Sequence, residues 1–169
     1  VFLTAYLLGA VDRCAFSGAR PALLICPGGG FAACSNREEE PIPCILQRRG
    51  IRCLCCNIPW GISRVPCADL RRRMGHAADS RRGKTLLCGS HKVAVMGFSA
   101  GGYVAAGLSV FAEKPSVCPE AAGGNIRPDA AVLCYPVLTA CRGLAHEAPS
   151  ACCSEKRRIR RSGAPSFLL

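Results

Sequence analysis

Aromatic side chains are scarce in this sequence, and so are lysine and histidine. Aromatics make up 6% of the 169 residues, only four of the 22 basic residues are lysines, and there are three histidines. No apolar run approaches the roughly 18 residues that a membrane-spanning helix requires. This absence excludes an integral membrane protein that crosses the bilayer with helices, and we expect no membrane partner.

The excess of basic residues raises the question of nucleic-acid binding. The formal net charge is +11, and arginines gather at 71–73, 81–82 and 157–161. Such clusters attract phosphate through counterion release, but modules that read a base sequence add a recognisable fold or aromatic stacking positions. With so few aromatics and no interleaving of basic and aromatic residues, we expect solvated arginines and no specific nucleic-acid partner.

The overall composition predicts one folded domain. Half of the residues are hydrophobic and 20% are charged, which excludes a globally disordered chain. A chain of this length buries about two-thirds of its unfolded surface in one core, so it needs neither disulfides nor a metal to hold together. We predict a single domain over residues 1–169, with a basic loop over 152–163 because that stretch has no apolar periodicity.

The 14 cysteines are placed like core residues. Cys53 and Cys56 form a C-x-x-C, but no second pair of ligands follows at zinc-finger spacing, and we expect no metal site. So many thiols indicate a reducing compartment. Residues 1–11 are apolar but lack the basic start of a signal peptide, so we expect a cytoplasmic location. Cysteines in or beside apolar runs, which we expect to pack as small hydrophobes, are Cys26, Cys53, Cys55, Cys88 and Cys134.

Apolar runs alternate with helical patterns along the chain. Ala22 to Cys26 is continuously apolar, which is typical of a strand buried on both faces. Ser35 and Glu38 have the spacing of a capping box that opens a helix, although Pro41 and Pro43 interrupt its first turns. The alternation implies βαβ crossovers and a mostly parallel sheet with helices on both faces. Strands are predicted over 1–8, 22–26, 51–58, 93–96 and 129–135, and helices over 35–50, 67–82 and 103–111.

The sequence Gly97-Phe98-Ser99-Ala100-Gly101 matches G-x-S-x-G and lies between an apolar strand and a helix of small residues. This is the context of a nucleophile elbow, a strained turn that exposes a serine hydroxyl. Gly97 and Gly101 would be the elbow glycines, because side chains there collide with the neighbouring strand and helix. The alternative is an ordinary turn from strand to helix.

A second glycine motif, Pro27-Gly28-Gly29-Gly30-Phe31, follows the earlier buried strand. An oxyanion loop at this place must present backbone N–H groups with no side chains in the way. A phosphate-binding loop is the competing interpretation. It fails because no G-K-[ST] follows Gly30 and because the glycines from Gly97 to Gly102 lack G-x-G-x-x-G spacing.

With these two motifs, and with segments such as Lys92 to Gly102 and Arg127 to Val137, the sequence resembles the α/β-hydrolase serine esterases. Within them it is similar to the acetyl-xylan esterase branch of small carbohydrate esterases. The resemblance implies a three-layer α/β-hydrolase fold and the hydrolysis of acetyl or other small esters, including acetylated sugars, with no cofactor and no metal. It also implies that Ser99 is the nucleophile and that backbone N–H groups form the oxyanion hole at Gly28, Gly29, Gly30 and Ala100.

The resemblance also implies that the chain is an N-terminal fragment. In the family, the triad acid follows a strand introduced by a proline, which 164–168 resembles, and the histidine comes later still. The alternative function is therefore an inactive hydrolase-like fragment or binding protein. A substitute triad can be written with Asp129 and His146, but Asp129 is expected at the start of a strand, opposite the edge where ligands bind. His76 and His91 are expected on the surface.

Overall fold

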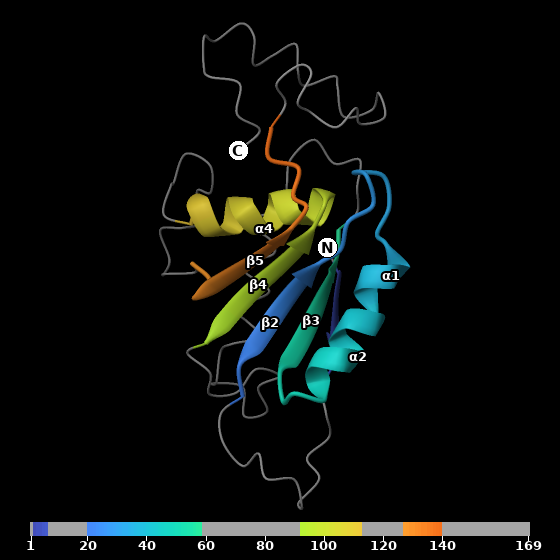
Figure 1. The fold of residues 1–169 in the computed structure, drawn as a ribbon, viewed down its shortest axis with the longest axis vertical. Helices are drawn as coiled ribbons and strands as arrows, with labels where there is room; N and C mark the ends of the chain where they lie inside the picture. Colours follow the sequence, from blue (N-terminus) through green and yellow to red (C-terminus); the bar gives the residue numbers. More distant parts are fainter. Residues whose placement is uncertain (1, 7–19, 59–91, 113–126, 140–169) are drawn as a thin grey trace, which may run out of the picture.

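The computed structural model describes residues 2–6, 20–58, 92–112 and 127–139 (Figure 1). Several of the predictions above fall elsewhere in the chain and stay untested. They concern the helix over 67–82, the basic loop over 152–163, the strand-like segment 164–168, the arginine clusters, Cys88 and all three histidines, which lie outside the described residues.

Five strands form one sheet in the order β1-β3-β2-β4-β5. β1 pairs with β3 in antiparallel fashion, whereas β3, β2, β4 and β5 are all parallel (Figure 1). The prediction of a mostly parallel sheet is therefore confirmed. β4 runs further than expected and reaches Phe98, directly before Ser99. The strands are β1 (Phe2–Tyr6), β2 (Ala22–Cys26), β3 (Arg52–Asn57), β4 (Val93–Phe98) and β5 (Ala130–Cys134).

Helices cover both faces of this sheet. The described helices are α1 (Asn36–Glu39), α2 (Pro41–Gln47) and α4 (Ala100–Val110). Successive residues of a strand point to opposite faces, and β2 is buried along its whole length. Its residue Leu24 belongs to the core cluster that contains Val104 of α4, while Ile25 belongs to the cluster against which Leu46 of α2 packs. The molecule therefore has three layers, as predicted.

The helix predicted over 35–50 is two helices in the structure. α1 ends at Glu39, and α2 begins at Pro41, its first residue. Proline has no N–H to donate and suits only the first turn of a helix, so a new helix starts there. The predicted capping box is wrong: a helix starts after Ser35, but the Ser35 side chain makes no capping hydrogen bond. The Glu38 carboxylate accepts a hydrogen bond from Gly28 instead.

The cysteines of β2 and β3 lie in the core, as predicted. Cys26, Cys53, Cys55 and Cys56 are fully buried. Burial raises the pKa of the Cys53 thiol to about 11 and that of the Cys55 thiol to about 12, because it disfavours the thiolate. Cys53 and Cys56 belong to core clusters on opposite faces of the sheet. The two thiols of the C-x-x-C therefore point away from each other and cannot hold one ion.

Two kinds of feature are absent from residues 2–6, 20–58, 92–112 and 127–139. None of the helices in these ranges is long and apolar enough to cross a membrane. The same ranges contain no group of three or more histidine, cysteine, aspartate or glutamate side chains that could hold a metal ion.

Candidate active site

The two glycine motifs meet at the carboxyl ends of β2 and β4, which are neighbours in the sheet. Cys26 at the end of β2 pairs with Gly97 near the end of β4. After β2 the chain crosses to β3 on one side, whereas after β4 it crosses to β5 on the other (Figure 1). The strand order therefore reverses between β2 and β4, and ligands of open α/β sheets bind at such a switch point.

Ser99 lies in the tight turn between β4 and α4. Its backbone has φ 49° and ψ −115°, a strained conformation for a residue with a side chain. The residue is half-buried, and its side chain makes no capping hydrogen bond to the helix. The Ser99 N–H donates to the Cys134 carbonyl at 3.0 Å, and the Val137 N–H donates to the Ser99 carbonyl at 3.2 Å. The last residue of β5 and the segment after it thus hold the strained turn in place.

Close packing requires glycine on both sides of Ser99. A Cβ atom at Gly101 would lie 2.0 Å from the carbonyl oxygen of Cys26 and 2.4 Å from that of Pro27. A Cβ atom at Gly97 would lie 2.4 Å from the carbonyl oxygen of Gly101. The first turn of α4 therefore rests directly on the end of β2, and this contact brings the helix N-terminus next to the loop that follows β2.

The glycine loop after β2 curls back beside Ser99. A Cβ atom at Gly28 would lie 3.1 Å from the Ser99 Cβ, so the two residues are neighbours. Gly29 has φ 140° and Gly30 has φ 61°, conformations that favour glycine. A Cβ atom at Gly30 would meet nothing within 4 Å, so this residue faces open space. Within the described ranges, the N–H groups of Gly29 and Gly30 donate no hydrogen bond.

The Gly28 N–H has a partner that the sequence did not predict. It donates to Oε2 of Glu38 at 2.6 Å. Gly28, predicted as an oxyanion donor, thus has its N–H bonded to a protein carboxylate in this structure. Within the loop, the groups left to face a ligand are the N–H groups of Gly29 and Gly30. The sequence contained a signal for Glu38, its spacing from Ser35, but that spacing pointed to a helix cap.

Tyr135, directly after β5, completes this arrangement. Its hydroxyl donates to Oε1 of Glu38 at 2.6 Å. The pKa of Tyr135 is raised to about 12, first because its hydrogen bond to the Glu38 carboxylate favours the protonated phenol, and then because of partial burial. The positive charge of Arg37 lowers the Tyr135 pKa, but by less than these effects raise it. Tyr135 ends the strand predicted over 129–135, but no sequence pattern assigned it a role in the site.

Asp129 lies at the far end of the sheet, as expected. Its Oδ2 accepts the Val93 N–H at 2.6 Å, and its own N–H donates to the Val93 carbonyl at 2.8 Å. Val93 begins β4 and Ser99 follows its end, so Asp129 is separated from Ser99 by about 20 Å at roughly 3.3 Å per residue. The substitute triad with Asp129 is therefore excluded.

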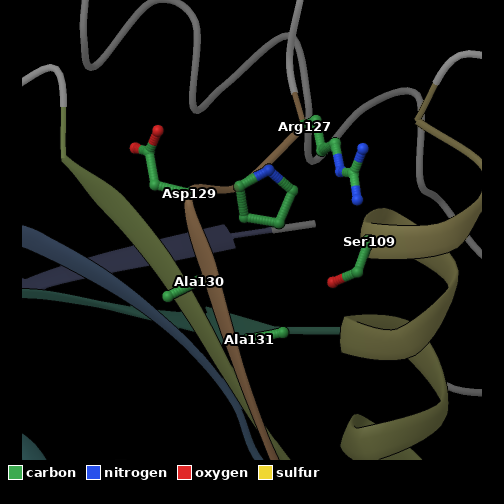
Figure 2. A pocket seen from close by; sticks show the side chains of 6 residues that line it. Ser109, Arg127, Asp129, Ala130 and Ala131 are labelled. Carbon is green, nitrogen blue, oxygen red and sulfur yellow. The ribbon is translucent and has the colours of Figure 1, made fainter.

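A cavity of about 390 Å³ lies at this same far end, and neither Ser99 nor the glycine loop lines it. Figure 2 shows the Arg127 and Ser109 side chains on one side of β5 and the Asp129 side chain on the other. The Ser109 hydroxyl donates to the Ala105 carbonyl at 2.8 Å. Ser109 is in the last turn of α4, whereas Ser99 precedes its first residue. The cavity is lined by Ser109, Arg127, Pro128, Asp129, Ala130 and Ala131.

Comparison with curated proteins finds relatives that act on xylan. The chain is 29% identical over 127 residues to endo-1,4-beta-xylanase B of Butyrivibrio fibrisolvens, which covers 71% of the chain and 20% of the relative. It is 27% identical over 129 residues to the acetylxylan esterase of Xylanibacter ruminicola, which covers 75% of the chain and 24% of the relative. The chain thus spans about a quarter or less of these relatives. No protein-family model matches it.

Solved structures give longer matches. An α/β-hydrolase enzyme from a Medee basin deep-sea metagenome library has a TM-score of 0.64 and 30% identity, covering 87% of this chain and 57% of that one. An acetyl ester-xyloside bifunctional hydrolase from Caldicellulosiruptor lactoaceticus has a TM-score of 0.62 and 26% identity, covering 89% and 53%. These neighbours confirm the predicted α/β-hydrolase fold and the resemblance to esterases. Their partial coverage fits the expectation of a fragment.

Proposed function

We propose that this chain carries the nucleophile and the oxyanion groups of a serine carboxylic-ester hydrolase. The observation that carries the proposal is the turn at Ser99, whose φ of 49° and ψ of −115° place a half-buried serine between β4 and α4, beside Gly28. A nucleophile elbow needs this combination of strand, strained serine and helix N-terminus. The esterases among its relatives support the same assignment.

In the proposed reaction, Ser99 Oγ attacks the ester carbonyl carbon. The negative charge that develops on the carbonyl oxygen is stabilised by the N–H groups of Ala100, Gly29 and Gly30. Ala100 is the first residue of α4, so its N–H has no partner within the helix. The alcohol leaves, and water then releases the acid from the acyl-serine. No cofactor takes part, since acyl transfer by serine needs none.

The reaction also requires a general base, because a serine hydroxyl is a weak nucleophile while it keeps its proton. Histidine fills this role in most serine hydrolases. The chain has three histidines, and all of them lie outside the described residues. Of these, His146 follows Ser99 in the chain order Ser…Asp…His that is usual for this fold.

We propose acetyl and other small esters as substrates, including acetylated sugars. The support comes from the relatives named for acetylxylan and for an acetyl ester and a xyloside. An inactive hydrolase-like protein is the second candidate. The observation that favours it is the position of Asp129, which pairs with Val93 at the far end of the sheet and leaves Ser99 without this carboxylate.

Hydrolysis of 4-nitrophenyl acetate by the purified 169-residue chain tests the proposal, with Ser99→Ala as the matched variant. We expect release of nitrophenolate that is lost in Ser99→Ala, because the variant lacks the attacking oxygen. Circular dichroism of both proteins establishes that they are folded. If the folded chain and the variant give the same rate, esterase activity of this chain is excluded and the inactive alternative stands.

A further inference from the structure

One carboxylate connects two segments that flank Ser99. Glu38, in α1, accepts the backbone N–H of Gly28 through Oε2 at 2.6 Å and the hydroxyl of Tyr135 through Oε1 at 2.6 Å. Gly28 follows β2 and Tyr135 follows β5. These two residues are distant in sequence, and the same side chain holds both at the carboxyl edge of the sheet.

Both segments touch Ser99 directly. On one side, a Cβ atom at Gly28 would lie 3.1 Å from the Ser99 Cβ. On the other side, Tyr135 lies between Cys134 and Val137, whose backbone groups are hydrogen-bonded to the N–H and the carbonyl of Ser99. The Glu38 side chain therefore ties together the two segments that contact Ser99.

A carboxylate is suited to this position because both of its oxygens act as acceptors, and both partners are donors. Hydrogen bonds to a charged acceptor are shorter and stronger than neutral ones. Glutamine has one oxygen and one NH₂ group. It can keep only one of the two bonds in its present direction, and neither bond then has a charged acceptor, so Glu38→Gln is a nearly isosteric way to weaken the bridge.

We propose that Glu38 is a positioning residue for ester hydrolysis, which fixes the Gly28 peptide so that the N–H groups of Gly29 and Gly30 face the oxyanion. This inference rests on the proposed function. The alternative is that Glu38 withholds an oxyanion donor by occupying the Gly28 N–H. The two possibilities predict opposite effects of breaking the bridge, since only the second predicts a faster enzyme.

Glu39 offers a matched control one residue away. Its Oε1 accepts the Asn57 side-chain amide at 2.6 Å, which ties α1 to the end of β3 and involves neither Ser99 nor the glycine loop. Glu39→Gln removes the same charge from the same helix. Any effect of Glu38→Gln that Glu39→Gln reproduces is therefore an effect of charge or of helix stability and not of the bridge.

The kinetic arm uses the full chain and 4-nitrophenyl acetate. We expect Glu38→Gln to lower kcat by about tenfold to a hundredfold with little change in KM, because loop displacements of about 1 Å have effects of this size. Glu39→Gln should keep the parent kcat. An unchanged or increased kcat in Glu38→Gln overturns the inference while leaving the proposed function standing.

The second arm needs no catalysis, so it separates a failure of this inference from a failure of the proposed function. In NMR relaxation, the amide order parameters of Gly28, Gly29 and Gly30 should fall in Glu38→Gln and stay constant in Glu39→Gln. In ultraviolet titration, Tyr135, identified by its loss in Tyr135→Phe, should titrate at a lower pH in Glu38→Gln. If the loop keeps its order in Glu38→Gln, Glu38 does not position it, whatever the chain hydrolyses.

Discussion

Gly101 shows how one missing side chain sets the distance between a strand and a helix. Any Cβ atom at this position would fall within 2.4 Å of two carbonyl oxygens of β2 and its loop, both of them rigid backbone atoms. We expect Gly101→Ala to lower the free energy of unfolding by roughly 1–3 kcal/mol, the usual effect of overpacking. Urea denaturation measures the change.

Val110→Ala is the control for this substitution, because Val110 lies on the same helix with 60% of its surface exposed. Its effect should stay within about 0.5 kcal/mol, as for most surface changes. Equal losses in the two variants would mean that α4 tolerates a Cβ atom at position 101, and that its first turn does not rest on β2.

A thiol at position 99 tests whether the turn and the helix N-terminus activate a nucleophile, because a thiolate needs no general base. Helix N-termini lower the pKa of a cysteine, and the thiolate is the nucleophile. We expect the introduced thiol of Ser99→Cys to be acetylated by 4-nitrophenyl acetate at least about tenfold faster than that of Ser109→Cys, which lies in the last turn of α4, since each pKa unit changes the thiolate fraction about tenfold. Peptide mass spectrometry quantifies each site. Similar rates at both positions would argue against the proposed oxyanion site.

Among the elements, the strands could be predicted and the break between α1 and α2 could not be placed in advance. β2 is buried along its whole length, and burial on both faces leaves a continuous apolar run that is visible in the sequence. The capping-box pattern at Ser35 and Glu38 is local, but the Glu38 carboxylate accepts hydrogen bonds from residues outside its helix. One of them, Tyr135, is 97 residues away. Tertiary contacts of this kind leave no trace in local spacing.

β3 carries two buried thiols that make the free energy of unfolding depend on pH in the alkaline range. The pKa values of Cys53 and Cys55 are raised from 9.0 to about 11 and about 12 by burial. Their folded-state pKa values exceed the unfolded ones, so their contribution is complete below pH 9.0 and is lost as the pH rises through about 12. We expect the free energy of unfolding, measured in urea under reducing conditions, to fall across this window.

The double variant Cys53→Ala/Cys55→Ala supplies the control, because it removes both thiols from the core. It should be less stable at neutral pH, since it leaves cavities. Its free energy of unfolding should nevertheless fall less steeply than that of the parent above pH 9.0, the ordinary value for a thiol. Identical slopes would show that groups other than these two thiols cause the alkaline loss.

At the scale of the whole molecule, the resemblance to esterases implied that the two glycine motifs form one site, but not how they are held together. Parallel strands end at the same edge of a sheet, so two glycine motifs that follow neighbouring strands had to converge. The strand order confirms this arrangement, with β2 beside β4. Whether Gly28 would face a substrate or a protein carboxylate depended on the position of α1, which the pattern of a helix does not determine.

The net charge of +11 predicts weak, non-specific binding to polyanions. Affinity for double-stranded DNA should fall by about a thousandfold between roughly 50 and 200 mM salt if about six phosphates are contacted. Fluorescence anisotropy with DNA duplexes of unrelated sequence measures this. Ser99→Ala should bind as the parent does. A marked preference for one duplex, or binding that resists salt, would contradict the expectation of solvated arginines.

Within the described residues, the non-glycine residues with positive φ are Phe31, Ser99 and Tyr135, and each follows the end of a parallel strand. A conformation of this kind costs on the order of 1–3 kcal/mol, which the rest of the fold must offset. Selection for heat resistance and selection for turnover should therefore favour different residues at these strained positions. Selection for thermal tolerance alone would favour glycine at position 99, whereas under the proposed function selection for growth on an acetyl ester would restore serine.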